Sequence, residues 1–389
     1  MSFLKFQADT IFTGTEALDA NMVLITDDKG KVVDVVNEAE AGLDIQQYKG
    51  IISPGFINCH CHLELSHLKG KIPEQTGIVD FILQILQKRN TSPEIIQDAI
   101  ELAENEMIEN GIVAVGDICN TNDTLLQKQK NKLYYHNFIE VSGFLPEAST
   151  SRFNQGEEIY NQFTKQFPHN TSLVPHAPYS VSEDLFKQIQ EFSENKIVSI
   201  HNQESNDENL FFKEGKGDFL RLYKTLVINI EFFNPPKESS LEYAIQFLNK
   251  ARTSILVHNT HTSFSDLELI KNTSEFKLTQ FYLCLCVLAN RYISGEIPPE
   301  IIFQQNFNKI VIGTDSLASN STLNILEEIK TLKLNYPKLS QFDLLQFATY
   351  NGAVALNMDD KFGSFIKGKK PGVLLIENLT TCTKPKKLV

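Results

Sequence analysis

The middle of the chain alternates short apolar runs with segments in which apolar residues recur at helical spacing. An apolar stretch from Gly55 to Ile57, entered through a Pro-Gly turn, is typical of a buried strand. Helical segments follow, such as one with Ser92 as N-cap and Pro93 in its first turn. Seven further runs are typical of strands: Gly111–Asp117, Leu133–Glu140, Ser172–His176, Lys196–His201, Thr253–His258, Thr279–Leu285 and Lys309–Asp315.

Counting the first strand, the pattern predicts eight strand–helix units. Eight such units within roughly 300 residues indicate an α/β fold of the (β/α)8 TIM-barrel type. A doubly wound open sheet is the alternative that this pattern leaves open. The segment from Ser205 to Lys250 is too long for an ordinary connection, and we expect it to form a helical lid or wall after the fifth strand.

The two ends of the chain differ from its middle because they carry short β-type runs. Met22–Ile25 and Val32–Val36 flank a turn near the N-terminus, and Gly372–Ile376 is a similar run near the C-terminus. We therefore expect two domains. Residues 1–50 plus 360–389 would form a small β-sandwich built from both termini, and residues 51–359 would form the barrel.

Composition narrows the class of protein further. Hydrophobic residues make up 42% and charged residues 22%, as in a soluble globular protein. A net charge of −12 without a basic stripe argues against nucleic-acid and anionic-membrane partners. No apolar run reaches membrane-spanning length, and the N-terminus lacks the apolar core of a signal peptide. We expect a cytoplasmic protein that acts on a small molecule, and a homodimer stays open.

The six cysteines do not indicate a disulfide scaffold in a chain of 389 residues. One interpretation of Cys59-His-Cys61 and Cys284-Leu-Cys286 is that they supply thiolate ligands to a metal. Their spacing differs from the paired Cys-x-x-Cys pattern of zinc sites, so the pattern favours buried strand cysteines.

Histidines gather where the predicted strands end. His60 and His62 follow the first strand and share one face, because side chains alternate along a strand. Barrel enzymes carry their chemistry at the C-terminal strand ends. Each residue alone is more often structural or solvated. However, five of the nine histidines and one aspartate lie at the C-terminal ends of predicted strands, which favours a shared functional site: His60, His62, His176, His201, His258 and Asp315. If three of these imidazoles and the one carboxylate bind a metal ion, such a ligand set suits zinc or ferrous iron better than calcium or magnesium.

Glu204 lies three residues beyond His201, just past the predicted end of the fifth strand. From there it could turn back over the site and carry a proton. A lone glutamate in such a loop is more often a solvated carboxylate, and the sequence alone leaves both interpretations open.

Five short motifs occur in a fixed order: Pro54-Gly55-Phe56-Ile57-Asn58-x-His60-x-His62, Pro175-His176-Ala177-Pro178-Tyr179-Ser180, His201-x-x-Glu204, Val257-His258 and Gly313-Thr314-Asp315-Ser316. Together they resemble the amidohydrolase superfamily, and most closely its deaminase/chlorohydrolase branch. That branch includes deaminases of methylthioadenosine, adenosylhomocysteine, aminodeoxyfutalosine and guanine, and s-triazine hydrolases. The likeness covers nearly the whole chain.

The resemblance implies a centre with one divalent ion, Zn or Fe(II), and assigns roles to residues at matching positions. His60, His62, His201 and Asp315 would hold the ion, with Asp315 also taking a proton. His258 would hydrogen-bond the attacking water, His176 would contact the substrate, and Glu204 would be the general acid/base. Glu74 and Asp80 both lie in the region where relatives contact a ribose, and either would make that contact. The alternative for each is a solvated loop acid. The fourth strand end, Val174-Pro175-His176, offers no lysine of the kind that bridges two metals in binuclear relatives.

The implied activity is metal-dependent hydrolytic deamination of an amino-substituted heterocycle, with a purine nucleoside-like substrate such as aminodeoxyfutalosine or methylthioadenosine. One alternative is hydrolysis of another C–N or C–Cl bond, as in guanine deaminase or s-triazine chlorohydrolases. Another is a non-catalytic scaffold on the same fold. Two features depart from relatives. Val287 stands where relatives usually have a proline after the seventh strand. Adenosylhomocysteine deaminases use arginines to hold the amino-acid carboxylate of their substrate. Because Arg152 is the only arginine between residues 90 and 220, the resemblance disfavours such a zwitterionic substrate.

Overall fold

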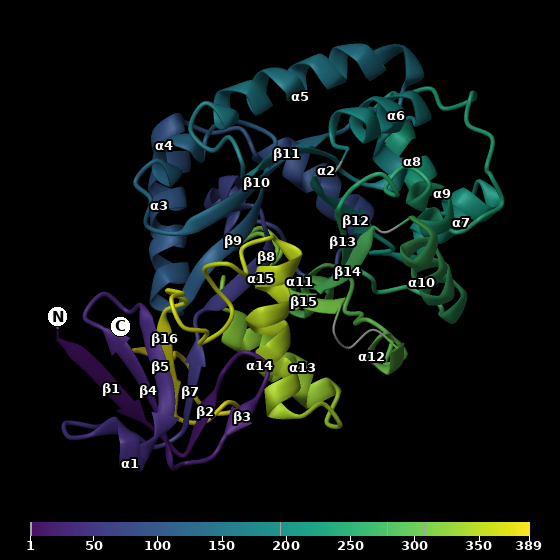
Figure 1. Cartoon of the computed structure of the whole chain (residues 1–389). Helices are drawn as coiled ribbons and strands as arrows, with labels where there is room; N and C mark the ends of the chain where they lie inside the picture. Colours follow the sequence, from purple (N-terminus) through teal and green to yellow (C-terminus); the bar gives the residue numbers. More distant parts are fainter. Residues whose placement is uncertain (1, 195, 278, 306–308) are drawn as a thin grey trace.

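The computed structural model describes residues 2–194, 196–277, 279–305 and 309–389. Its centre consists of parallel strands in two four-stranded sheets, ordered β11-β10-β9-β8 and β12-β13-β14-β15 (Figure 1). The strands are β8 (Phe56–Cys61), β9 (Ile112–Cys119), β10 (Tyr134–Val141), β11 (Thr171–Pro175), β12 (Ile197–Asn202), β13 (Thr253–His258), β14 (Gln280–Leu285) and β15 (Ile310–Ile312). Most of their side chains are buried on both faces, as in a parallel sheet covered by helices.

The two sheets contact each other at both edges. At one edge, the backbone N–H of His201 donates to the carbonyl of His176, just after β11, over 2.9 Å. At the other, Cys61 forms an isolated parallel bridge with Asp315. Within the described ranges the strand ladders stay two separate sheets, so the continuous ladder of a closed barrel is not seen. One reason is that β15 has only three residues, where a seven-residue strand from Lys309 to Asp315 was expected.

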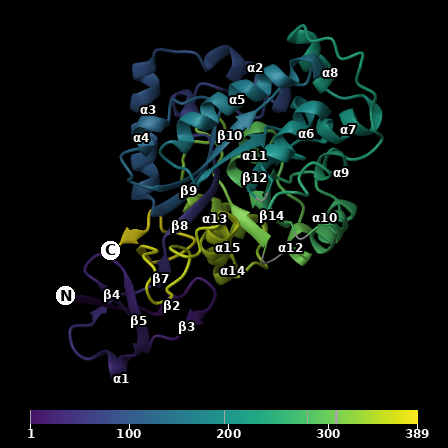
Figure 2. The same cartoon turned by 45° about the horizontal axis from the view of Figure 1, so that its top comes forward.

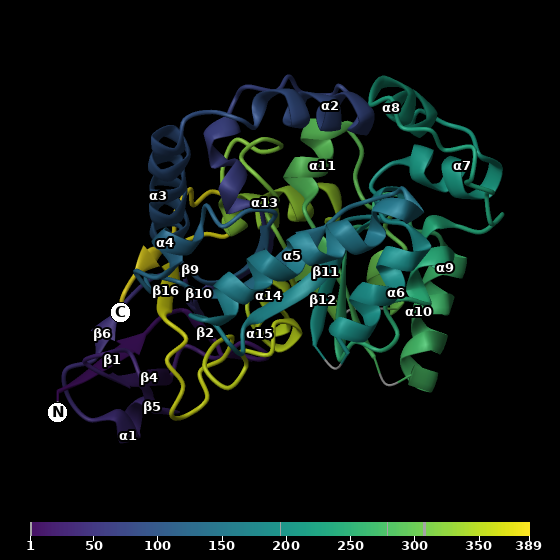
Figure 3. The ribbon, with the colours of Figure 1, turned by 90° about the horizontal axis from the view of Figure 1, so that it is seen from above.

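Helices follow the strands and lie outside them (Figure 3). Between β8 and β12 they are η1 (Leu63–Leu68), α2 (Ile78–Lys88), α3 (Pro93–Glu109), α4 (Leu125–Lys128), η2 (Pro146–Ala148), α5 (Ser149–Thr164), η3 (Pro178–Ser180) and α6 (Glu183–Phe192). After β13 come α10 (Phe264–Lys277), α11 (Val287–Ile293), α12 (Ile302–Gln305), α13 (Ile325–Asn335), α14 (Gln341–Ala348) and α15 (Tyr350–Ala355). No helix in the described part of the chain combines the length and apolar character needed to cross a membrane.

The long segment after β12 contains three helices: α7 (Asn206–Glu214), α8 (Phe219–Thr225) and α9 (Ser240–Ile245). The Ser239 side chain caps α9 by accepting from the N–H of Glu242. Aromatic side chains attach this segment to the strand ends, since the Phe219 ring stacks on Tyr179 with centroids 4.1 Å apart. The segment is therefore a helical wall beside the C-terminal ends of β11 and β12.

Both ends of the chain contribute to two mixed sheets that lie together at one corner of the molecule (Figure 2). Their order is β5-β4-β1-β6 and β17-β16-β7-β2-β3. The strands are β1 (Phe3–Gln7), β2 (Thr10–Phe12), β3 (Ala17–Leu18), β4 (Met22–Asp27), β5 (Val32–Asn37), β6 (Gln46–Gln47), β7 (Ile51–Pro54), β16 (Val373–Ile376) and β17 (Lys386–Lys387). A short helix, α1 (Glu38–Ala41), follows β5 and was not expected.

One apolar cluster joins these two sheets, because Phe6 and Leu24 from the first pack with Ile52 and Leu375 from the second. The β7 strand leads directly into β8 through Gly55. A Cβ at this glycine would lie 2.4 Å from the Val113 Cγ1 atom and 2.8 Å from the Pro371 carbonyl oxygen, so only glycine fits here without displacing a neighbour. The sandwich arrangement of the sheets stays a prediction.

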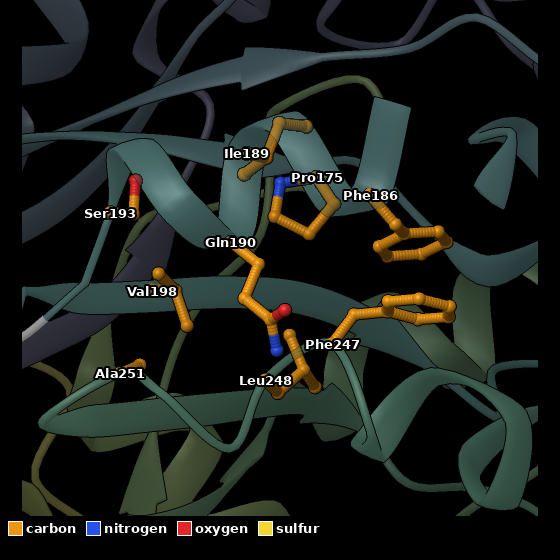
Figure 4. A pocket seen from close by; sticks show the side chains of 9 residues that line it. All are labelled: Pro175, Phe186, Ile189, Gln190, Ser193, Val198, Phe247, Leu248 and Ala251. Carbon is orange, nitrogen blue, oxygen red and sulfur yellow. The ribbon is translucent and has the colours of Figure 1, made fainter. Parts of the chain in front are cut away.

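A small cavity of about 10 Å³ lies between α6, β12 and residues 247–251 (Figure 4). Its lining is mainly apolar, and the rings of Phe186 and Phe247 stack at one side with centroids 5.0 Å apart. None of the residues with a predicted functional role lines it, so it is a packing defect rather than a candidate site.

Candidate functional site

Three histidines from β8 and β12 converge at the C-terminal strand ends. The Nε2 atom of His62 lies 3.2 Å from the Nε2 atoms of both His60 and His201. The Oδ1 atom of Asp315 lies 3.5 Å from His60 Nε2 and 3.4 Å from His62 Nε2. All four side chains are buried. The donor atoms of the three histidines thus lie within 4.8 Å of one another, and Asp315, 255 positions after His60, approaches two of them.

The spacing of these atoms fits a divalent ion. Four ligands at about 2.1 Å in tetrahedral geometry lie about 3.4 Å from one another. Burial lowers the pKa of His60 to about 3 and also lowers the pKa of His62, so both rings are neutral and can offer a lone pair. Burial would raise the pKa of Asp315, but its hydrogen bond to His60 and the nearby histidine charges lower it well below its usual range. Neutral imidazoles and one carboxylate are the donor set that zinc and ferrous iron accept.

The end of β15 is fastened to β8 by a local network. The Asn58 side chain donates to Thr314 Oγ1 over 2.8 Å, and the backbone N–H groups of Thr314 and Asp315 both donate to the His60 carbonyl over 3.0 Å. Asp315 has a φ of +58°, which ends the strand and turns its side chain toward the histidines. The Ser319 hydroxyl donates to Asp315 Oδ2 over 2.5 Å and leaves Oδ1 facing His60 and His62.

Glu204 and His258 form a pair beside this cluster, with 3.5 Å between Glu204 Oε1 and His258 Nε2. Burial raises the pKa of Glu204 to about 8, so the carboxyl group is mainly protonated near neutral pH and can donate. The Nδ1 atom of His258 lies 2.8 Å from Asn290 Oδ1, and the amide of Asn290 is oriented by its bond to Thr260 Oγ1. These contacts keep the proton on Nδ1 and leave Nε2 as an acceptor.

His176 stands next to the cluster rather than in it. Its ring centroid lies 4.8 Å from that of His201, and its Nδ1 atom lies 2.6 Å from Ser180 Oγ. Burial lowers the pKa of His176 to about 4, so the ring is neutral.

The two acidic residues expected near a ribose lie in the segment before and at the start of α2, where neither contacts a histidine. Glu74 is exposed, and Asp80 forms an ion pair of 2.7 Å with Arg221 of α8. The substrate contact expected of either residue stays a prediction.

Sequence reasoning missed Glu140, the last charged residue of β10. Its Oε1 atom lies 3.3 Å from His201 Nδ1, and its Oε2 atom accepts from the Asn120 amide over 2.9 Å. Burial would raise the pKa of Glu140, but His176 and His201 outweigh this effect and lower it to about 2, so the group is an anion. The signal was present, since the predicted strand Leu133–Glu140 ends in a carboxylate at the functional edge. Asn290 and Ser319 carried no comparable signal, because Asn290 lies in helix α11 and Ser319 lies beyond the end of β15, away from any predicted strand end.

The fold and this site define an α/β protein with a buried, histidine-rich candidate metal centre, and comparison with known proteins gives its family. Residues 51–387 match the sequence model of the amidohydrolase family, and the chain belongs to that family. It is a hydrolase that acts on C–N bonds other than peptide bonds.

Relatives with curated functions are deaminases. The chain is 26% identical over 321 residues to adenosine deaminase from Helicobacter pylori, covering 80% of this chain and 75% of that protein. It is also 26% identical over 344 residues to aminodeoxyfutalosine deaminase from Nitratiruptor, covering 84% and 79%.

Solved structures resemble the whole fold. The crystal structure of Helicobacter pylori aminofutalosine deaminase in complex with methylthio-coformycin has a TM-score of 0.83 at 21% identity, covering 99% of this chain and 100% of that chain. A zinc-bound adenosine deaminase from Xanthomonas campestris has a TM-score of 0.71 at 20% identity, covering 96% and 84%.

Proposed function

We propose that this protein is a metal-dependent hydrolytic deaminase of an amino-substituted heterocycle. One observation carries the proposal: four donor atoms on His60, His62, His201 and Asp315 meet at separations of 3.2 to 3.5 Å along the measured pairs, beside the Glu204–His258 pair. These four residues would hold one divalent ion, zinc or Fe(II). The curated relatives, which are deaminases, support the same reaction class.

The proposed architecture is a barrel with a small second domain. The contacts between β11 and β12 and between β15 and β8 support closure of the two parallel sheets into a (β/α)8 barrel over residues 51–359. The shared apolar cluster, to which Ile52 of β7 also contributes, supports a β-sandwich formed by residues 1–50 and 360–389 together with this strand. In this arrangement the histidines lie at the C-terminal mouth of the barrel, where substrates enter.

The bound ion would supply a Lewis acid that makes a water molecule nucleophilic near neutral pH. The chain's own groups would handle the protons. Glu204 donates a proton from its carboxyl group to the ring nitrogen beside the reacting carbon, so no anion builds up on the buried ring. His258 orients the attacking water through Nε2, and Asp315 accepts a proton at Oδ1. The amino group then leaves as ammonia after a second proton transfer.

The proposed substrate is a purine nucleoside-like compound, such as aminodeoxyfutalosine, methylthioadenosine or a related 6-aminopurine nucleoside. The names of the curated relatives support this class. We assign substrate contacts to His176, whose ring faces the cluster, and to Glu74 or Asp80 for the sugar. Asp80 would have to exchange its ion pair with Arg221 for the sugar hydroxyls.

A substrate panel tests this proposal. Zinc-loaded and iron-loaded protein would be incubated with adenosine-type nucleosides, guanine and a chloro-s-triazine, while ammonia and chloride release are measured. We expect ammonia from one or more nucleosides. Turnover confined to guanine, or chloride release from the triazine, would contradict the nucleoside assignment. A metal-loaded protein that turns over none of these compounds would contradict deamination of such heterocycles.

A further inference from the structure

Glu140 occupies a position behind the candidate metal ligands. It lies near the end of β10, between Asn120 after β9 and His201 of β12, and only 4% of its side chain is exposed. A buried carboxylate that has no partner is costly, so its contacts indicate why the fold retains it. No role was expected for Glu140 from the sequence.

Both carboxylate oxygens of Glu140 have protein partners. Oε1 lies 3.3 Å from His201 Nδ1, and Oε2 accepts from Asn120 Nδ2 over 2.9 Å. The same amide group also reaches the Glu140 carbonyl oxygen at 3.3 Å. Because each oxygen is already engaged, the carboxylate is arranged to hold protein groups rather than a substrate.

Asn120 is itself held firmly in place. Its backbone N–H and that of Thr121 both donate to Glu64 Oε2 over 3.0 Å. Glu64 lies 3.4 Å from the Arg89 guanidinium group. A continuous polar chain therefore runs from Arg89 through Glu64 and Asn120 to Glu140, and it fixes the carboxylate on the far side of the His201 ring.

The His201 ring is contacted from this side by two acceptors. Its Nδ1 atom lies 2.8 Å from the His176 carbonyl oxygen as well as 3.3 Å from Glu140 Oε1. The His176 carbonyl can only accept, so the proton is on Nδ1 and Nε2 presents its lone pair toward His62, while Glu140 is a charged neighbour of the same N–H group. An anion at Nδ1 also makes Nε2 a stronger donor to a metal, which is the general effect of a carboxylate behind a ligating histidine.

We propose that Glu140 is a positioning residue that orients His201 and thereby strengthens divalent-ion binding at His60, His62, His201 and Asp315. This inference rests on the metal centre of the proposed function. A different use of the same group, a second ion held by Glu140, His176 and His201, is geometrically open because their ligand atoms lie within 4.8 Å of one another. It would cost the hydrogen bond from His201 Nδ1 to the His176 carbonyl, so the observed contacts favour positioning.

Zinc affinity, measured by competition with a chromophoric chelator, tests the assignment in the Glu140→Gln variant. The substitution keeps the shape of the side chain and removes its charge. We expect one ion per chain, as in the wild type, bound about ten- to a hundredfold more weakly. Once the variant is saturated with zinc, we expect KM for the substrate to be unchanged.

The matched control is Glu104→Gln, a buried carboxylate whose partners are Gln127 and Tyr135 and which contacts none of the four ligands. Its zinc affinity should equal that of the wild type.

Three results would overturn the inference. Unchanged zinc affinity with a raised KM would make Glu140 a substrate contact. Two ions in the wild type and one in Glu140→Gln would make it a ligand. Unchanged affinity and unchanged KM would leave it no role at the site. If Glu140→Gln does not fold, Asn120→Ala leaves the Glu140 carboxylate in place and removes the amide that donates to its Oε2 atom and to its carbonyl oxygen. That variant should weaken zinc binding in the same direction, and equal affinity would contradict the proposal. A wild-type chain that binds no ion would instead contradict the proposed function.

Discussion

At the scale of single residues, Glu204 is distinguished from other carboxylates by its protonation. Burial raises its pKa to about 8, while its neighbour Asp315 is held as an anion by the histidines. Two carboxyl groups in one site thus differ in protonation at neutral pH: Glu204 is mainly neutral and Asp315 is an anion. This separation lets one donate a proton while the other accepts one.

Replacing Glu204 with glutamine should remove the donated proton without disturbing metal binding. We expect unchanged zinc content and a turnover at least about a hundredfold lower, the usual contribution of a positioned general acid. Ammonia release and elemental analysis would measure both quantities. Glu183→Gln, an exposed carboxylate in the first turn of α6, is the control and should behave like the wild type. Near-normal turnover in Glu204→Gln would remove this residue from the mechanism.

Lys128 is a second unusual residue, because it is a fully buried lysine. Its Nζ atom lies 2.6 Å from Asp117 Oδ2 and 2.8 Å from Asn137 Oδ1. The other oxygen of Asp117 accepts from the backbone N–H of Leu63, directly after His62. The buried ion pair therefore holds the chain where it leaves the first strand.

Lys128→Met should leave Asp117 as a buried charge without a cation and destabilise the fold by about 3–5 kcal/mol. Chemical denaturation would measure this loss in free energy of unfolding. Lys187→Met removes an exposed lysine that pairs with Glu183 across one helical turn, and it should change stability by less than about 0.5 kcal/mol. Equal effects of the two substitutions would show that the buried pair has no special role.

The sequence predicted part of this residue-level picture. Six residues were selected because strand ends can be located from apolar runs and parallel strands bring their ends to one edge: His60, His62, His176, His201, His258 and Asp315. The choice of four metal ligands among them came from the resemblance to the amidohydrolase superfamily. The left-handed backbone at His258 and Asp315 could not be anticipated, because residues other than glycine rarely adopt it without tertiary support. The partners of Glu140 were also out of reach, since Asn120 follows β9 and His201 lies in β12, and only the folded chain brings both side chains to Glu140 of β10.

At the scale of elements, the close approach of β15 to β8 decides where Asp315 lies. Gly313 makes this approach possible. A Cβ at Gly313 would lie 2.8 Å from His60 Cβ and 2.9 Å from Cys286 Sγ. The two strands can therefore lie this close only with glycine at this position.

Gly313→Ala should push β15 away from β8, with a loss of about 1–3 kcal/mol in stability from overpacking and a weaker metal site. Denaturation and zinc competition would report the two effects. Gly70→Ala is a control for backbone strain alone, because Gly70 has a φ of +68° and no atom within 4 Å of its Cβ position. It should lose some stability and keep its zinc affinity. A Gly313→Ala variant with native zinc affinity would contradict this account of the strand contact.

Element boundaries were less predictable than element existence. Thr253–His258 matches β13 at both ends, whereas the expected strand Lys309–Asp315 is reduced to Ile310–Ile312. The difference has a physical reason. The backbone N–H groups of Thr314 and Asp315 donate to the His60 carbonyl, and that of Thr314 also donates to Asn58 Oδ1, so neither continues the ladder with β14. The pattern of apolar residues carries no information about such bonds.

At the scale of the whole molecule, the candidate ligands connect parts of the chain that are far apart. His60 lies in the first parallel strand and His62 directly after it, His201 belongs to the fifth, and Asp315 follows the eighth. An ion bound by all four would therefore link both four-stranded sheets, and it would bind the native state but not the unfolded chain.

Removing the metal should lower the melting temperature, since free ion at about 100 times its Kd stabilises the native state by about 2.7 kcal/mol. Thermal unfolding with zinc and after chelation would measure the difference. Two variants separate a specific site from weak surface binding. His201→Ala should lose the zinc-dependent shift, because a ligand is missing. His176→Ala should keep it, because this ring bonds to Ser180 and lies beside the cluster. An equal zinc-dependent shift in both variants would contradict the assignment of His201 as a ligand and His176 as a neighbour.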